Sequence, residues 1–157
     1  MMLPLRQVSC LRVVIAGSNA DLVVALRDGL EAGPGVVVCA EASDRPAVLR
    51  IALDERPDAC LVTYEPGFDS VGVVEALVEH APHVSVVLSG DEPDDDTLMR
   101  AVAIGASGYV PSGIEGPQLA AALFDAVSGQ PVFPPRLARL LIGRLREESG
   151  ATFDGEA

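Results

Sequence analysis

The first feature that could bind a ligand is the loop Gly17-Ser18-Asn19, which follows an apolar run. A glycine loop before a helix can hold a phosphate through backbone N–H groups. The dinucleotide fingerprint, however, needs three spaced glycines, and the P-loop needs a lysine. All 11 basic residues are arginine, so the chain contains no lysine. The sequence therefore does not predict nucleotide binding here, and it excludes any mechanism that needs a lysine ammonium.

An acidic run at residues 90–96, GDEPDDD, is dense in oxygen atoms that could bind a cation. Its carboxylates belong to Asp91, Glu92, Asp94, Asp95 and Asp96. Neither their spacing nor the position of a glycine matches a calcium-binding loop. Negative charge is favourable at the start of a helix. We therefore interpret the run as a solvated loop with a helix cap.

Cysteine and histidine residues show no catalytic or metal-binding pattern. Cys39 and Cys60 lie in apolar runs, and no histidine is close in sequence to activate either thiol, so we expect core thiols. His80 and His83 flank the end of a predicted helix, where an imidazole can interact with free carbonyl groups. No acid–base pair, activated nucleophile or metal cluster is visible. The sequence predicts a protein that is not an enzyme and needs no cofactor.

Composition bounds the class of protein. The chain has 157 residues, 49% of them apolar, which suits one modest domain with its own core. Its formal net charge of −12 repels phosphate backbones and anionic membranes, so this segment alone should not bind nucleic acid or a membrane. No run approaches the roughly 20 apolar residues of a membrane span. Three widely spaced cysteines fit a reducing compartment, and we expect a cytoplasmic protein.

Short β-branched runs alternate with stretches of helical periodicity. Strands are predicted at residues 11–16, 36–41, 59–64, 84–89 and 107–111. Helices are predicted at residues 20–31, 45–55, 70–80, 94–104 and 116–128. The strands are continuous apolar runs, as expected where helices cover both faces of a parallel sheet. The pattern predicts an α/β fold with a doubly wound, five-stranded parallel sheet.

Four segments divide the chain. We expect an N-terminal tail at residues 1–10, a domain at 11–129, a proline hinge with a linker helix at 130–148, and a flexible tail at 149–157. The hinge is QPVFPP, and the helix after it carries leucines at helical spacing with arginines between them. This extra C-terminal helix could pack on the domain, contact a second copy, or lead into a further domain.

The string AVAIGASGYVPSG at residues 101–113 resembles the receiver domain of bacterial response regulators, particularly the LuxR/NarL class. The segments RPDACLV, residues 56–62, and PGFD, residues 66–69, add to the resemblance. It covers residues 11–129 and implies a flavodoxin-like strand order of 2-1-3-4-5. The hinge and last helix resemble the segment that joins such receivers to a DNA-binding domain.

The resemblance also implies where a phosphorylation site would lie. In a working receiver an acidic pair holds Mg²⁺, an aspartate accepts the phosphoryl group, and a lysine neutralises it. Here the acidic pair falls on Gly17 and Ser18, the phosphoacceptor on Thr63, and the lysine on Ser112. The PGFD loop also comes one residue early, after TYE. The switch positions, the hydroxyl Ser89 and the aromatic Tyr109, still match the family.

These departures predict a pseudo-receiver that lacks the phosphorylation site and does not respond to Mg²⁺. Our first hypothesis is a phosphorylation-independent regulatory domain of a bacterial two-component-type transcriptional regulator. It would dimerise, through faces that the resemblance implies on the first and fifth helices or around the fourth helix, fifth strand and fifth helix. DNA would be bound only through a domain beyond Ala157.

An alternative hypothesis gives the vacated pocket a ligand. The pocket would be lined by the small and hydroxyl residues Gly17, Ser18, Thr63, Ser89 and Ser112, and a stand-alone pseudo-receiver would sense a small molecule or a protein there. For Tyr109, a packed strand residue and a switch remain equally open. An enzyme of the same fold is the third and least favoured hypothesis.

Overall fold

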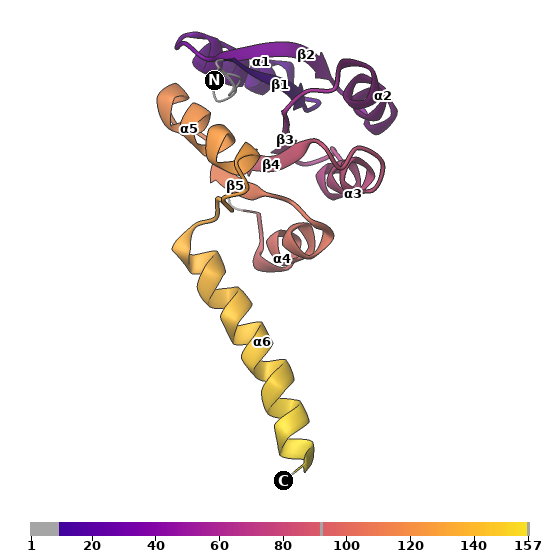
Figure 1. The fold of residues 1–157 in the computed structure, drawn as a ribbon, viewed down its shortest axis with the longest axis vertical. Helices are drawn as coiled ribbons and strands as arrows, with labels where there is room; N and C mark the ends of the chain where they lie inside the picture. Colours follow the sequence, from indigo (N-terminus) through magenta and orange to yellow (C-terminus); the bar gives the residue numbers. More distant parts are fainter. Residues whose placement is uncertain (1–9, 92, 157) are drawn as a thin grey trace, which may run out of the picture.

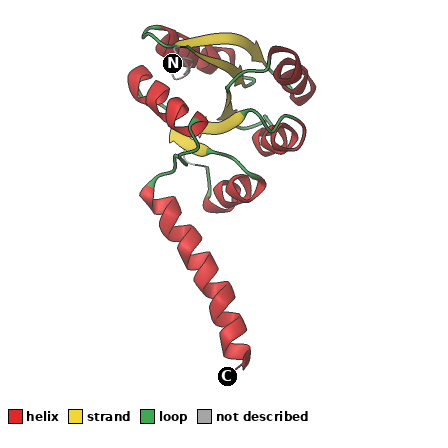
Figure 2. Cartoon of the chain, viewed as in Figure 1, coloured by secondary structure: helices red, strands yellow, loops and turns green. Residues whose placement is uncertain are grey.

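The computed structural model describes residues 10–91 and 93–156, so residues 1–9 of the predicted N-terminal tail lie outside it. Strands and helices alternate along the chain (Figures 1 and 2). The strands are β1 (Leu11–Ala16), β2 (Val36–Ala42), β3 (Ala59–Tyr64), β4 (Ser85–Gly90) and β5 (Gly108–Pro111). The helices are α1 (Ala20–Glu31), α2 (Arg45–Glu55), α3 (Ser70–His80), α4 (Asp95–Ile104), α5 (Gly116–Val127) and α6 (Pro135–Glu156).

The predicted strands and helices are confirmed, with ends that shift by one residue in β2, β4, β5, α4 and α5. Helix α4 shows the reason for one shift. Asp94, predicted as its first residue, is instead the N-cap, and its carboxylate accepts a hydrogen bond of 2.7 Å from the N–H of Thr97. A cap residue has extended dihedral angles and lies just outside the helix. The helix-cap interpretation of the acidic run is therefore confirmed at Asp94.

All five strands run parallel, in the order β2-β1-β3-β4-β5. Helices α1 and α5 pack together on one face of the sheet, and α2, α3 and α4 cover the other (Figure 1). Two buried apolar clusters fill the space between the sheet and these two helical layers. The predicted doubly wound fold and strand order are confirmed. This order places the chain reversal between β1 and β3, where such sheets carry their sites.

Thiol burial agrees with the expected core role. Cys60 is fully buried, and burial raises the pKa of its thiol to about 12. Cys39 lies half-buried against the same cluster, and burial raises the pKa of its thiol as well. Because the thiolate is the nucleophilic form, burial makes both thiols less nucleophilic at neutral pH.

The segment expected to be a proline hinge is fastened to the sheet. Val132 forms a parallel bridge with Gly108 at the free edge of β5. The N–H of Tyr109 donates to the Val132 carbonyl at 2.7 Å, and the N–H of Val132 donates to the Ser107 carbonyl at 3.0 Å. Further along, Leu137 at the base of α6 is fully buried. The hinge interpretation is corrected, because backbone pairing and apolar burial together hold the base of α6.

Helix α6 continues through Glu156, so the predicted flexible tail at residues 149–157 is corrected to helix as far as the structure describes it. No proline follows Pro135, and a single internal glycine such as Gly150 costs only about 1 kcal/mol. The helix projects away from the domain (Figures 1 and 2). None of the described helices combines the length and the apolar character that crossing a bilayer requires.

Gly108 is required for this fastening, because a Cβ atom there would lie 2.5 Å from the Val132 carbonyl oxygen. We expect Gly108→Ala to lower the free energy of unfolding by about 1–3 kcal/mol, since the backbone has to move apart. Urea denaturation measures this. The matched control is Gly33→Ala, where a Cβ meets nothing within 4 Å. An equal effect of the two substitutions would contradict the role of Gly108.

Candidate functional site

The candidate site lies at the carboxyl edge of the sheet, where the predicted positions gather. Gly17 follows β1, Thr63 lies near the end of β3, and Ser112 follows β5. Thr63 is paired in register with Ser89 of β4. Parallel strands bring their carboxyl ends to one edge, which is where ligands bind in open α/β sheets. The sheet therefore places all of these positions at the edge expected from the sequence.

Gly17 is pressed against Thr63. A Cβ atom on Gly17 would lie 2.4 Å from Thr63 Oγ1 and 3.0 Å from its Cγ2. Gly17 is buried, and Thr63 is fully buried, so neither side can yield into solvent. The position that would carry one member of the acidic pair thus has no room for any side chain while Thr63 is present.

A carboxylate that sequence reasoning missed occupies the centre of this edge. Ser18 Oγ donates to Glu65 Oε1 at 2.6 Å, and Thr63 Oγ1 donates to Glu65 Oε2 at 2.5 Å. Glu65 follows β3 directly, two residues after Thr63. The early arrival of the PGFD loop after TYE was the sequence signal that could have found it. Glu65 was not among the residues that the sequence predicted at this site.

Hydrogen bonding keeps Glu65 ionised. Burial alone raises the pKa of this carboxyl, but the hydroxyls of Ser18 and Thr63 and the backbone N–H groups of Asn19 and Ser18 together outweigh it. The pKa is lowered from its ordinary value of 4.5. Hydrogen bonds to the charged form favour that form. At neutral pH the edge of the sheet therefore holds a fixed negative charge.

Thr63 is held from both sides. Its hydroxyl lies 3.3 Å from the Ala16 carbonyl oxygen in addition to its bond with Glu65. Its own carbonyl accepts a 2.7 Å hydrogen bond from the buried Ser70 hydroxyl at the start of α3. A general base works best with a pKa near the operating pH, and the lowered pKa of Glu65 makes it a poor base for this hydroxyl.

The Ser112 side chain does not bind the Glu65 carboxylate. Its hydroxyl donates to Asp91 Oδ1 in the loop after β4, and its N–H donates to the Gly90 carbonyl at 3.1 Å. The structure therefore does not bring Ser112 together with Ser18 and Thr63 around one ligand space. It divides the expected pocket into a Glu65 cluster, formed by Ser18, Thr63 and Glu65, and a separate contact between Ser112 and Asp91.

The two switch positions are both buried. Ser89 is 1% exposed and Tyr109 is 7% exposed. The Tyr109 hydroxyl donates to the Gly90 carbonyl at 2.6 Å, so the ring points inward. The Gly90 carbonyl also accepts a hydrogen bond from the N–H of Ser112, so it is bound both by β5 and by the loop after β5. Tyr109 thereby connects the end of β4 to β5, and β5 is the strand that pairs with Val132.

The residues at this edge do not fit the Mg²⁺ that the receiver fold implies. Mg²⁺ needs near-ideal octahedral oxygen geometry, usually with one or two free carboxylates. Both oxygens of Glu65 already accept hydrogen bonds from hydroxyl groups, and Asp91 accepts one from Ser112. Across residues 10–91 and 93–147, whose side chains the structure describes, no three histidine, cysteine, aspartate or glutamate side chains converge in the manner of a metal site.

Comparisons with known proteins agree with the fold. No protein-family model matches the chain. It is 25% identical over 137 residues to the transcriptional regulatory protein LiaR of Bacillus subtilis. It is 28% identical over 122 residues to the DNA-binding transcriptional activator DevR/DosR of Mycobacterium tuberculosis. These alignments cover 87% and 77% of this chain, but only 65% and 56% of the two relatives. The chain therefore spans less than two thirds of their length.

A solved structure has a similar fold. The signal receiver domain of a NarL response regulator from Mycobacterium tuberculosis superposes with a TM-score of 0.71 at 24% identity. The match covers 78% of this chain and 99% of that one. The fold is thus that of a receiver domain, and the curated sequence relatives are transcriptional regulators.

The ionised state of Glu65 predicts a pH-dependent contribution to stability. Because its pKa is lowered in the folded state, the contribution is present above pH 4.5 and is lost as pH falls through the folded pKa. We expect Glu65→Gln to be less stable than the parent at pH 7, with a difference that shrinks below about pH 4.5. Urea denaturation at a series of pH values measures both. A difference that is constant with pH would contradict the assignment.

The contact between Gly17 and Thr63 predicts strong coupling. Gly17→Ala alone should lower the free energy of unfolding by about 1–3 kcal/mol because of overpacking. In a Thr63→Ala background the clashing atoms are absent, so the same substitution should cost at least about 1 kcal/mol less. A double-mutant cycle measured by denaturation tests this. If the two substitutions change the free energy of unfolding additively, the added methyl group at position 17 and the Thr63 side chain do not compete for the same space.

Proposed function

We propose that this chain is a phosphorylation-independent, receiver-like regulatory domain of a bacterial two-component-type transcriptional regulator, working in the cytoplasm. It acts through dimerisation and through contacts with partners or neighbouring domains. The receiver fold and the likeness to transcriptional regulators support the general class. The chemistry of the carboxyl edge supports the independence from phosphorylation.

The observation that carries the proposal is the Glu65 cluster. In a receiver that is switched by phosphorylation, the negative charge at this edge changes when the phosphoryl group arrives. Here the side chain of Glu65 already supplies an anion, and the hydroxyls of Ser18 and Thr63 are committed to it. The state of this edge is therefore set by the fold itself and does not wait for a phosphodonor.

DNA recognition belongs, in this proposal, to a further domain. The chain carries a formal net charge of −12, and phosphate contacts need a surface with positive potential. DevR/DosR is named as a DNA-binding activator, and this chain aligns with 56% of its length. Helix α6 leaves the domain in a defined direction, which would fix the position of whatever it joins.

The Glu65 cluster also weighs against the alternative of a small-molecule sensor in the vacated pocket. The hydroxyls of Ser18 and Thr63 were the groups expected to receive a ligand, and both bind Glu65. Of the two other hydroxyl residues expected there, Ser112 binds Asp91 and Ser89 is 1% exposed. A ligand would have to displace a carboxylate from its hydrogen-bond donors, so no observation favours this function.

Small phosphodonors should leave the protein unchanged. After incubation with acetyl phosphate and Mg²⁺, we expect intact-mass spectrometry to detect no phosphate adduct. The reason is that Glu65 is a poor base for Thr63 and that both of its oxygens are already committed to hydroxyl groups. The dimerisation constant measured before and after the treatment should also be the same. A phosphate adduct that Thr63→Ala abolishes would overturn the proposal.

Added Mg²⁺ should not stabilise the fold. A ligand that binds the folded state raises the melting temperature. We expect equal melting temperatures in millimolar MgCl₂ and in NaCl of matched ionic strength, measured by thermal denaturation. A rise in MgCl₂ alone that disappears in Glu65→Gln would show that Glu65 holds the ion, and would contradict the proposal.

A further inference from the structure

Helix α6 presents an apolar stripe that its own domain does not cover. At its base Leu137 is fully buried, and Leu140 and Leu141 pack against the core. Beyond this base the helix exposes Ile142 and Leu145, which are 48% and 62% accessible. These two residues are three positions apart, so they lie on one helical face. They are two of the most exposed large apolar side chains of the described chain.

Arginines border this stripe. Four of the 11 arginines fall within residues 136–146, a stretch that has no acidic residue. Arg144 is paired with Asp96 of α4 at 2.9 Å and helps to hold the helix. Arg139 and Arg146 are exposed, seven residues apart, on a common side next to Ile142. The free face of α6 is thus apolar with a basic edge, whereas the whole chain has a net charge of −12.

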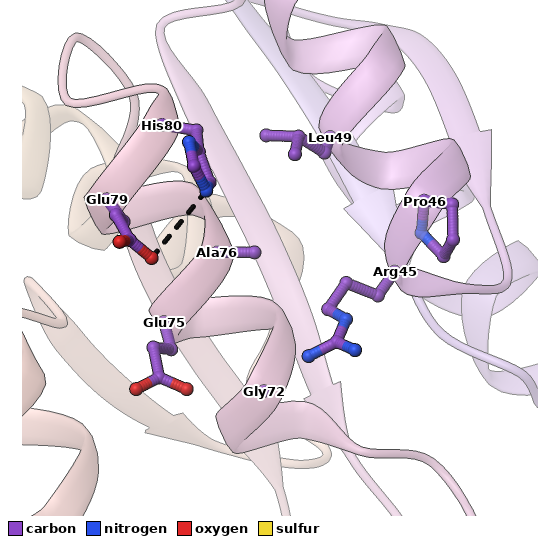
Figure 3. A pocket seen from close by; sticks show the side chains of 8 residues that line it. All are labelled: Arg45, Pro46, Leu49, Gly72, Glu75, Ala76, Glu79 and His80. Atoms are coloured by element: carbon purple, nitrogen blue, oxygen red, sulfur yellow. Dashed lines mark ion pairs between the residues drawn. The ribbon is translucent and has the colours of Figure 1, made fainter.

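A groove of the opposite character lies between α2 and α3. It has a volume of about 340 Å³ (Figure 3). Leu49 of α2 and Ala76 of α3 line its floor, and the 47% exposed Leu53 continues the apolar surface one turn further along α2. Glu75 and Glu79 form the edge on α3 (Figure 3).

The groove also contains basic side chains, and their positions favour one orientation of a bound helix. Arg45 lies on the α2 wall, and His80 Nε2 is 3.6 Å from Glu79 Oε1 at the other end of the groove (Figure 3). A basic partner helix is therefore expected to turn its arginines toward Glu75 and Glu79, away from Arg45. This asymmetry would fix one orientation of a bound helix.

We propose that the free face of α6 docks in the groove between α2 and α3 of a second copy of this chain. This inference rests on the dimerisation in the proposed function and names its surfaces. Ile142 and Leu145 would cover the apolar floor, and Arg139 and Arg146 would meet Glu75 and Glu79. Apolar burial would supply most of the affinity, and the charges would supply register and specificity.

Charge favours this partner over parallel pairing of two α6 helices. Parallel packing would bring the two arginine-rich stretches into contact, and like charges repel. Docking on the body of a second copy brings the same arginines onto carboxylates. Helix α6 has 22 residues, which gives a length of roughly 33 Å, enough to reach a neighbouring domain. Exchange of α6 in both directions closes the assembly as a two-fold dimer.

Sedimentation equilibrium of the 157-residue chain and its variants tests the proposal. We expect a dimer whose dissociation constant rises at least about tenfold in the double variant Ile142→Asp, Leu145→Asp. The charge reversals Glu75→Arg, Glu79→Arg and Arg139→Glu, Arg146→Glu should each weaken the dimer. Mixing these two double variants should restore a heterodimer, because both of its contacts then join opposite charges.

Val24→Asp on α1 is the matched control, because Val24 is 38% exposed and belongs to neither surface. It should leave the dimer intact, and circular dichroism should show that every variant is folded. A dimer that tolerates Glu75→Arg, Glu79→Arg, or one that Val24→Asp disrupts, overturns this inference and leaves the proposed function standing. A monomeric parent chain also overturns it, whereas insensitivity to phosphodonors is tested separately by the mass measurement.

Discussion

The hydrogen bonds of the Glu65 carboxylate organise the functional edge of this domain. They join the loop after β1, through Ser18, to the end of β3, through Thr63. The close approach of the two strands at this point is possible only because Gly17 has no side chain. A negative charge that is satisfied by several donors is both ionised and immobile. The edge thus carries a negative charge that the hydrogen bonds of the fold hold in place.

A second set of contacts connects that edge to the projecting helix. The Tyr109 hydroxyl binds the Gly90 carbonyl, while the Tyr109 N–H binds the Val132 carbonyl. Val132 is followed by the buried Leu137, and Arg144 pairs with Asp96. One residue of β5 therefore contacts both the end of β4 and the segment that starts α6. The arrangement makes α6 a fixed extension of the domain, so its exposed face has a defined direction.

Most of the fold could be predicted because its signals are local. Continuous apolar runs and helical periodicity, with the acidic run at the start of α4, placed every strand and helix of residues 11–127 to within a residue at each end. The fastened linker was not predictable in this way. It depends on Gly108 approaching a backbone oxygen of a residue 24 positions later. A flexible stretch and a paired one share the same proline-rich composition.

The sequence by itself determined the class of fold and the missing lysine, because these follow from periodicity and residue types. The resemblance to receiver domains added that the carboxylates it implies at positions 17 and 63 are replaced by glycine and threonine. Neither could determine what fills the space that those carboxylates leave. Only the tertiary structure decided that Glu65 turns back to Ser18 and Thr63, while Ser112 turns to Asp91. The physical reason is that hydrogen-bond partners 47 or 21 residues apart are selected by the geometry of the folded edge, and side-chain type alone does not specify that geometry.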